Sequence, residues 1–167
     1  MMKKMSLIAV CMLLLVSNVL LAQNKYVGAS ACKMCHMTKG KAYPVWSTSK
    51  HAKAFEVLKG EAAIKVGKDN GVTTPSTDAK CLKCHTTASS AGAANGGITN
   101  ADGVSCESCH GPGSVYKTKM TNLVEAKKAG LIIPTNAVCI KCHNTEIHKS
   151  LTFDFATKMK IISHKNP

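Results

Sequence analysis

The pattern of apolar and polar positions divides the chain into a hydrophobic start and a long, mostly polar remainder. An apolar run extends from Leu7 to Leu21, shortly after Lys3 and Lys4. A basic start followed by about 15 apolar residues is typical of a secretory signal peptide, and the run is shorter than the roughly 20 residues of a spanning helix. We therefore predict a signal peptide at residues 1–22 and one mature domain at residues 23–167.

Cys11 lies inside the apolar run, where the alternative is a lipoprotein signal. A lipid-attachment cysteine needs a small residue before it, and here Val10 precedes it, while the apolar run continues beyond it. We predict that Cys11 leaves with the signal peptide and that the mature chain has no stable membrane insertion. The predicted location is the periplasm, with an extracellular location as the alternative.

Beyond residue 23 the pattern predicts short helices between irregular segments. A short turn is expected at each copy of the motif described below, and longer helices at about residues 42–59, 116–129, 136–149 and 153–162. In the first of these, His51, Phe55 and Leu58 share one face. Small and polar residues at 88–97 predict a surface loop. The expected fold class is therefore mainly α with much irregular structure.

One cysteine motif recurs four times in the polar remainder, at residues 32–36, 81–85, 106–110 and 139–143. Each copy has two cysteines separated by two residues and followed at once by a histidine. Two thiols at this spacing reach the two vinyl groups of one porphyrin, and the histidine then points at its iron, so the chain is predicted to carry four haem c groups. The predicted thioether residues are Cys32, Cys35, Cys81, Cys84, Cys106, Cys109, Cys139 and Cys142. The predicted proximal iron ligands are His36, His85, His110 and His143.

Disulfides and zinc sites are the other uses for eight cysteines in an exported chain. The gaps between successive motifs are 44, 20 and 28 residues, which is irregular for paired zinc ligands. Neither alternative requires a histidine after every second cysteine. Because four haems are many for a chain of this length, we expect the porphyrins to form most of the core.

Three histidines lie outside the motifs: His51, His148 and His164. Each is a candidate distal ligand, because every haem iron has a second axial position. His148 follows the proximal His143 by only five residues, a tether too short to reach the opposite face of the same haem, so it is expected to serve a neighbouring haem. Seven histidines cannot fill eight axial positions. One iron is therefore either open or bound by Met120 or Met159.

All 22 basic residues are lysines, and the formal net charge is +13, or +11 without the two lysines of the signal peptide. Arginine is the best side chain for reading phosphates and bases, and its absence, together with export, argues against a nucleic-acid partner. The propionates of four haems would offset most of this excess charge. The remaining lysines are expected either to guide other redox proteins, the electron donor and acceptor, or to form an ordinary solvated surface.

Several segments of the chain resemble the multihaem cytochrome c-554 family. They are the opening from Tyr26 to His36 with Trp46 and residues 49–52, the third motif with its flanks at 103–113, and the closing segment 153–164. The resemblance implies periplasmic electron transfer, several haems with two histidine ligands, and one haem without a distal protein ligand. It also implies that His51 is a distal ligand, and it points to the second haem, on His85, as the open one.

The leading interpretation is an electron carrier between periplasmic redox partners, rather than a catalyst. The first alternative is a haem enzyme that reduces a small nitrogen compound, such as nitric oxide, at the open iron. The second alternative is a subunit of an extracellular cytochrome filament.

Overall fold

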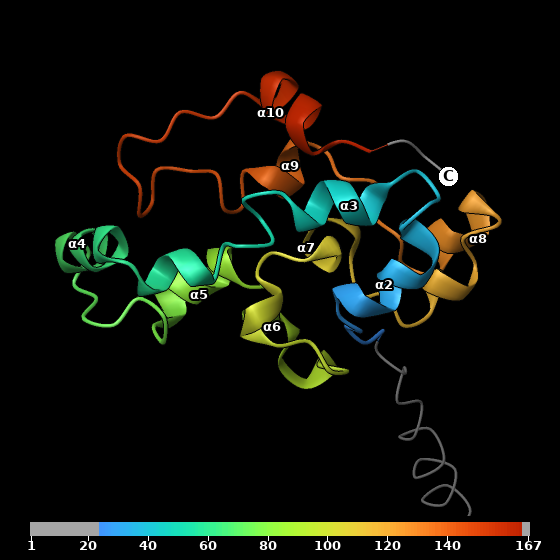
Figure 1. Cartoon of the computed structure of the whole chain (residues 1–167), viewed down its shortest axis with the longest axis horizontal. Helices are drawn as coiled ribbons and strands as arrows, with labels where there is room; N and C mark the ends of the chain where they lie inside the picture. Colours follow the sequence, from blue (N-terminus) through green and yellow to red (C-terminus); the bar gives the residue numbers. More distant parts are fainter. Residues whose placement is uncertain (1–23, 165–167) are drawn as a thin grey trace, which may run out of the picture.

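The structure is a computed structural model that describes residues 24–164, so the predicted signal peptide and Cys11 lie outside the described residues. The described chain forms short helices and no strand, as Figure 1 shows. In chain order these are α2 (Ala29–His36), α3 (Ala42–Ser47), η1 (Glu56–Lys59), α4 (Glu61–Asp69), α5 (Ala79–His85), α6 (Ala88–Ala91), η2 (Gly92–Ala94), η3 (Asn100–Asp102), α7 (Cys106–His110), η4 (Tyr116–Thr118), α8 (Leu123–Lys128), α9 (Asn136–Cys139) and α10 (Phe155–Ile162). The expected fold class, mainly α with much irregular structure, is confirmed. None of the described helices is long and apolar enough to cross a membrane.

The helix predicted at 42–59 is broken into α3 and η1. The hydroxyl of Thr48 donates to the carbonyl of Pro44 at 3.0 Å, and that of Ser49 donates to the carbonyl of Trp46 at 2.6 Å. Hydroxyls that bond to nearby carbonyls compete with the helical hydrogen-bond ladder. The residues between α3 and η1 therefore form turns, and His51 lies in a turn rather than on a helix.

Two other predicted helices are also shorter than expected. Residues 116–129 form only η4 and α8, and residues 136–149 form only α9. After α9, the side-chain amide of Asn144 donates to the carbonyls of Ile140 and Lys141, which caps the turn there.

The last predicted helix, at 153–162, is present as α10, and the carboxylate of Asp154 caps its start by accepting from the N–H of Thr157. Helix α4 was missed, because Gly67 interrupts its pattern.

Within residues 24–164 the apolar core consists of two small clusters. Leu58, Val72 and Cys81 form one cluster, against which Phe55 and Leu82 pack. Tyr116, Ala126 and Leu131 form the other, against which Met120 and Ala129 pack. Clusters of this size leave much of the interior to be completed by other groups.

The segment 88–97, expected to be a loop, forms α6 and η2. Its backbone also hydrogen-bonds to that of Tyr26, which precedes α2. The N–H of Tyr26 donates to the carbonyl of Ala94 at 2.9 Å, and the N–H of Gly96 donates to the carbonyl of Tyr26 at 2.8 Å. The segment therefore holds the residues that lead into α2.

A buried carboxylate joins the residues just before α2 to the third motif. The side chain of Glu107, in α7, is 1% exposed and accepts from three backbone N–H groups. The donors are Val27 at 2.9 Å, Gly28 at 2.9 Å and Gly113 at 2.7 Å. A carboxylate can only accept, so three N–H donors satisfy it without a cationic partner.

We expect Glu107→Gln to destabilise the holoprotein by about 2–3 kcal/mol, because the amide NH₂ turns a donor toward backbone donors and leaves an N–H unpaired. The matched control is Glu125→Gln on α8, where the carboxylate is exposed, and it should change the stability by less than about 0.5 kcal/mol. Thermal denaturation followed by far-ultraviolet circular dichroism measures both. Equal effects of the two substitutions would show that Glu107 contributes no more than a surface carboxylate.

Candidate haem sites

Each of the four motifs lies at or just after a helix. Helices α2, α5 and α7 end at the motif histidines His36, His85 and His110. Helix α9 ends earlier, and His143 lies in the turn that follows, with its N–H bonded to the carbonyl of Cys139 at 2.9 Å. A helical turn places both cysteines and the histidine of one motif on the same side, as covalent attachment of one porphyrin requires.

The structure places each of the three histidines outside the motifs beside a motif histidine. The ring centres are 5.9 Å apart for His51 and His143, 6.3 Å apart for His85 and His148, and 5.8 Å apart for His110 and His164. Two imidazoles that ligate one metal from opposite sides, with metal–nitrogen bonds of about 2 Å, hold their ring centres roughly 6 Å apart. All three pairs therefore have the spacing of two axial ligands of one iron.

The position of His148 agrees with the expectation that it serves a haem other than that of His143. It disagrees with the expectation that the haem on His85 is the open one, because His148 lies beside His85. The sequence could not reveal this, since the 57 residues between His85 and His143 leave their relative placement free. Among the described residues, His36 is the motif histidine without a ring partner.

Backbone carbonyls orient two of the motif histidines. Nδ1 of His85 lies 2.7 Å from the carbonyl oxygen of Ala54, and Nδ1 of His110 lies 2.9 Å from that of Ile132. With the proton on Nδ1, the lone pair of Nε2 points away from the carbonyl and is available to a metal. Burial also lowers the pKa of His110 and of His51, which favours the neutral, ligating form of both rings.

His143 is held differently, by an aromatic ring that sequence reasoning missed. The ring of Phe153 stacks on His143 with the centres 4.6 Å apart. No motif signals this contact, because Phe153 lies ten residues further along the chain and apolar residues there have no special spacing.

The distal candidate His51 is fixed through its backbone by the segment before the third motif. The carbonyl of His51 accepts from the N–H of Val104 at 3.0 Å, and the carbonyl of Val104 accepts from the indole of Trp46 at 2.8 Å. Gly103 has φ +58°, and a Cβ there would lie 2.7 Å from the carbonyl oxygens of both His51 and Ala52. The position thus requires glycine for conformation and for space.

Sulfur atoms of different motifs lie close together and link the motifs in a row. The thiol of Cys32 hydrogen-bonds to that of Cys106, and the thiol of Cys84 hydrogen-bonds to that of Cys142. These contacts raise the pKa of Cys106 and of Cys142 and lower the pKa of Cys84 to about 7. In the holoprotein these atoms stand for thioether sulfurs. The contact between Cys32 and Cys106 joins the first motif to the third, and that between Cys84 and Cys142 joins the second to the fourth.

The third and fourth motifs also lie near each other. Cys109 of the third motif lies near enough to Cys139 of the fourth that its charge raises the pKa of Cys109, after the larger effect of burial. The spatial order of the motifs is therefore first, third, fourth, second. Figure 1 agrees, since α2 and α5 lie toward opposite ends of the molecule with α7 and α9 between them.

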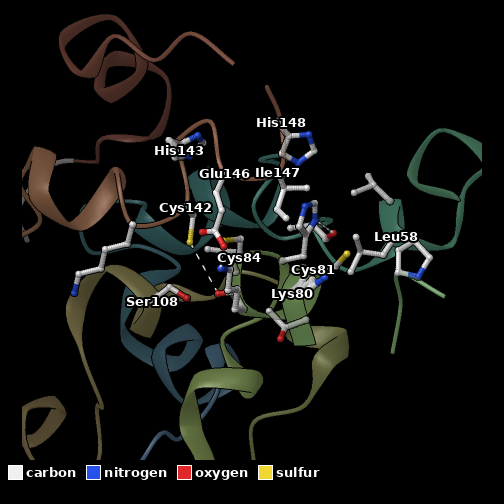
Figure 2. A pocket seen from close by; sticks show the side chains of 18 of the residues that line it. Leu58, Lys80, Cys81, Cys84, Ser108, Cys142, His143, Glu146, Ile147 and His148 are labelled. Atoms are coloured by element: carbon white, nitrogen blue, oxygen red, sulfur yellow. Dashed lines mark hydrogen bonds and ion pairs between the residues drawn. The ribbon is translucent and has the colours of Figure 1, made fainter. Parts of the chain in front are cut away.

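The space beside the second and fourth motifs suits a porphyrin. A cavity of about 750 Å³ is lined by the cysteines and histidines of both motifs, together with His51 and His148. Figure 2 shows the sulfur atoms of Cys84 and Cys142 close together inside this cavity, with His143 and His148 on its wall. The cavity, the attachment cysteines and the histidine pairs fit haem c, and nitrogen ligands on both sides of an iron suit electron transfer.

Comparisons with known proteins agree with this geometry. The family model described as cytochrome c554 and c-prime matches residues 31–111. Cytochrome c-554 of Nitrosomonas europaea is 32% identical over 108 residues, which cover 59% of this chain and 43% of that protein. The chain therefore matches less than half the length of this curated relative.

The solved structure of reduced cytochrome c554 from Nitrosomonas europaea has the same fold. It superposes with a TM-score of 0.60 at 23% sequence identity, over 83% of each chain. The fold and the four attachment motifs define a c-type cytochrome with four haem c groups. Over residues 31–111 the chain is similar to the cytochrome c554 and c-prime family, and its fold is that of the solved cytochrome c554.

The mature holoprotein should carry four haems, because every cysteine beyond residue 23 belongs to an attachment motif. Mass spectrometry of the denatured protein measures this as four haem additions to the chain mass. A mass equal to that of the bare chain with disulfides would exclude haem attachment at these cysteines.

Gly103→Ala should lower the stability by the cost of the left-handed backbone, about 1–2 kcal/mol, and by a further steric cost of about 1–3 kcal/mol. It should also displace His51 and give part of one haem a high-spin absorption spectrum. The control is Gly71→Ala, where φ is +70° and nothing lies within 4 Å of the added Cβ. This control should lose only the stability that the left-handed backbone costs, and its haems should keep their spin state. A normal spectrum for Gly103→Ala would mean that His51 does not depend on this contact.

Proposed function

We propose that the protein is an electron carrier that passes electrons along a row of four haems between other redox proteins. The proximal ligands are His36, His85, His110 and His143, and the thioethers are those of the four motifs. The axial pairs are His143 with His51, His85 with His148, and His110 with His164. The observation that carries the proposal is the ring-centre spacing of 5.8–6.3 Å in these three pairs.

An iron with two histidine ligands has no open position for a substrate, which favours electron transfer over catalysis at three of the four haems. The haem supplies a one-electron couple when it is bound. The residues of this chain orient the ligands: carbonyls hold His85 and His110, Phe153 holds His143, and the Val104 contact holds His51. A rigid ligand set changes little between the two oxidation states of its iron.

The contacts between motifs support the order of transfer. The sulfur of Cys32 meets that of Cys106, Cys109 lies near Cys139, and Cys142 meets Cys84. Electrons would then pass from the first haem to the third, fourth and second, or in reverse. The two ends of this row, at α2 and α5, lie toward opposite ends of the molecule in Figure 1, so two different partners can dock, one near each end.

The partners that we propose are an electron donor and an electron acceptor in the periplasm. This location rests on the signal peptide predicted at residues 1–22 and on covalent haem attachment. The curated relative that is 32% identical over 108 residues is also named a cytochrome, which agrees with a role in electron transfer. Lysines in excess over acids favour partners with acidic docking surfaces.

Stopped-flow mixing of the fully reduced holoprotein with an oxidised single-haem cytochrome c that has an acidic surface tests the carrier function. We expect all four haems to be oxidised, and the reaction to slow as salt is added, because exposed lysines and an acidic partner attract each other through a screened interaction. Oxidation of only some of the haems, or steady consumption of nitrite or nitric oxide without exchange with the acceptor, would favour an enzyme instead.

A further inference from the structure

The first motif differs from the other three in its surroundings. The other three motif histidines have a second histidine ring 5.8–6.3 Å away, and among the described residues His36 has none. Its Nδ1 atom is buried without a hydrogen-bond partner, whereas those of His85 and His110 lie against carbonyl oxygens. The ring of His36 thus has neither a second histidine ring opposite it nor a carbonyl that orients its Nδ1 atom.

No methionine of the described chain is placed to supply the missing ligand. Met34 and Met37, the nearest along the sequence, are 88% and 44% exposed. Met120 packs against the cluster of Tyr116, Ala126 and Leu131. Met159 lies on α10, five residues before His164, which is already beside His110.

The first motif is also accessible from solvent. Cys35 is exposed, and the side chain of Met34 points almost entirely into solvent. Helix α2, which carries the motif, lies toward one end of the molecule in Figure 1 rather than between other motifs. The first motif therefore lies at the surface, toward one end of the row of motifs.

We propose that the haem held by His36 is the one with an open axial position, and that it binds a small neutral diatomic ligand that accepts electron density from ferrous iron. This inference rests on the proposed haem ligation. It moves the open position from the second haem, which the family resemblance pointed to, to the first haem at one end of the row. Because a distal histidine blocks each of the other irons, the ligand site is single.

Carbon monoxide is the probe, and the holoprotein is titrated with it in the dithionite-reduced state. We expect one carbon monoxide per protein, and a ferric resting spectrum in which one haem of four is high-spin. His148→Ala leaves every attachment motif intact. It should raise the stoichiometry to two and the high-spin count to two, because it opens the iron on His85.

A matched pair of proximal substitutions assigns the site. Methionine ligation raises the potential of a haem, so His36→Met should raise the midpoint potential of the haem that binds carbon monoxide. His85→Met should instead raise the potential of a haem that does not bind it. The count of four haems by mass is checked in each variant.

The outcomes separate this inference from the proposed function. A shift of the carbon monoxide haem in His85→Met, or a stoichiometry that stays at one in His148→Ala, would place the open iron on the second haem and overturn the inference. Four low-spin haems that bind no carbon monoxide would overturn it as well. Electron transfer along the row would stand in each of these cases, whereas fewer than four haems or no exchange with a cytochrome acceptor would overturn the proposed function itself.

Discussion

The two axial positions of a haem iron lie on opposite faces of the porphyrin, and the rest of this structure depends on that constraint. An attachment motif supplies a ligand to one face only, so the second ligand must come from another part of the chain. Here His51, His148 and His164 come from three separate segments and lie beside His143, His85 and His110. These pairs join distant segments, which explains how the described part of the chain keeps one arrangement with two small apolar clusters.

Polar contacts hold the segments between the ligands where packing is sparse. The carboxylate of Glu107 joins the entry to α2 with the third motif through three N–H donors. The hydroxyl of Thr87 lies 2.5 Å from that of Ser108 and accepts from the N–H of Ser105 at 2.7 Å, which ties α7 to the segment after the second motif. In a fold built around cofactors, such buried and satisfied polar groups specify the path of the chain.

The parts of the site that were predictable from the sequence are those set by local spacing. Two cysteines and a histidine on one turn predict haem attachment wherever they occur, and a five-residue tether excluded His148 as a partner for His143. The partner of each distal histidine depends on long-range packing, so the pairing of His148 with His85 could not be predicted. The extent of the helix around His51 was overestimated for a related reason, because the back-bonding of Thr48 and Ser49 competes with apolar periodicity and leaves no periodic signal.

The row of four irons and its three histidine pairs are the central claim, and diffraction from crystals of the holoprotein at the iron absorption edge tests it most directly. The account predicts four iron positions in the order first, third, fourth, second motif. It also predicts an iron between the rings of His51 and His143, of His148 and His85, and of His164 and His110, and a fourth iron with His36 on one side only. An iron bound by His85 alone, or His51 and His143 on different irons, would contradict it.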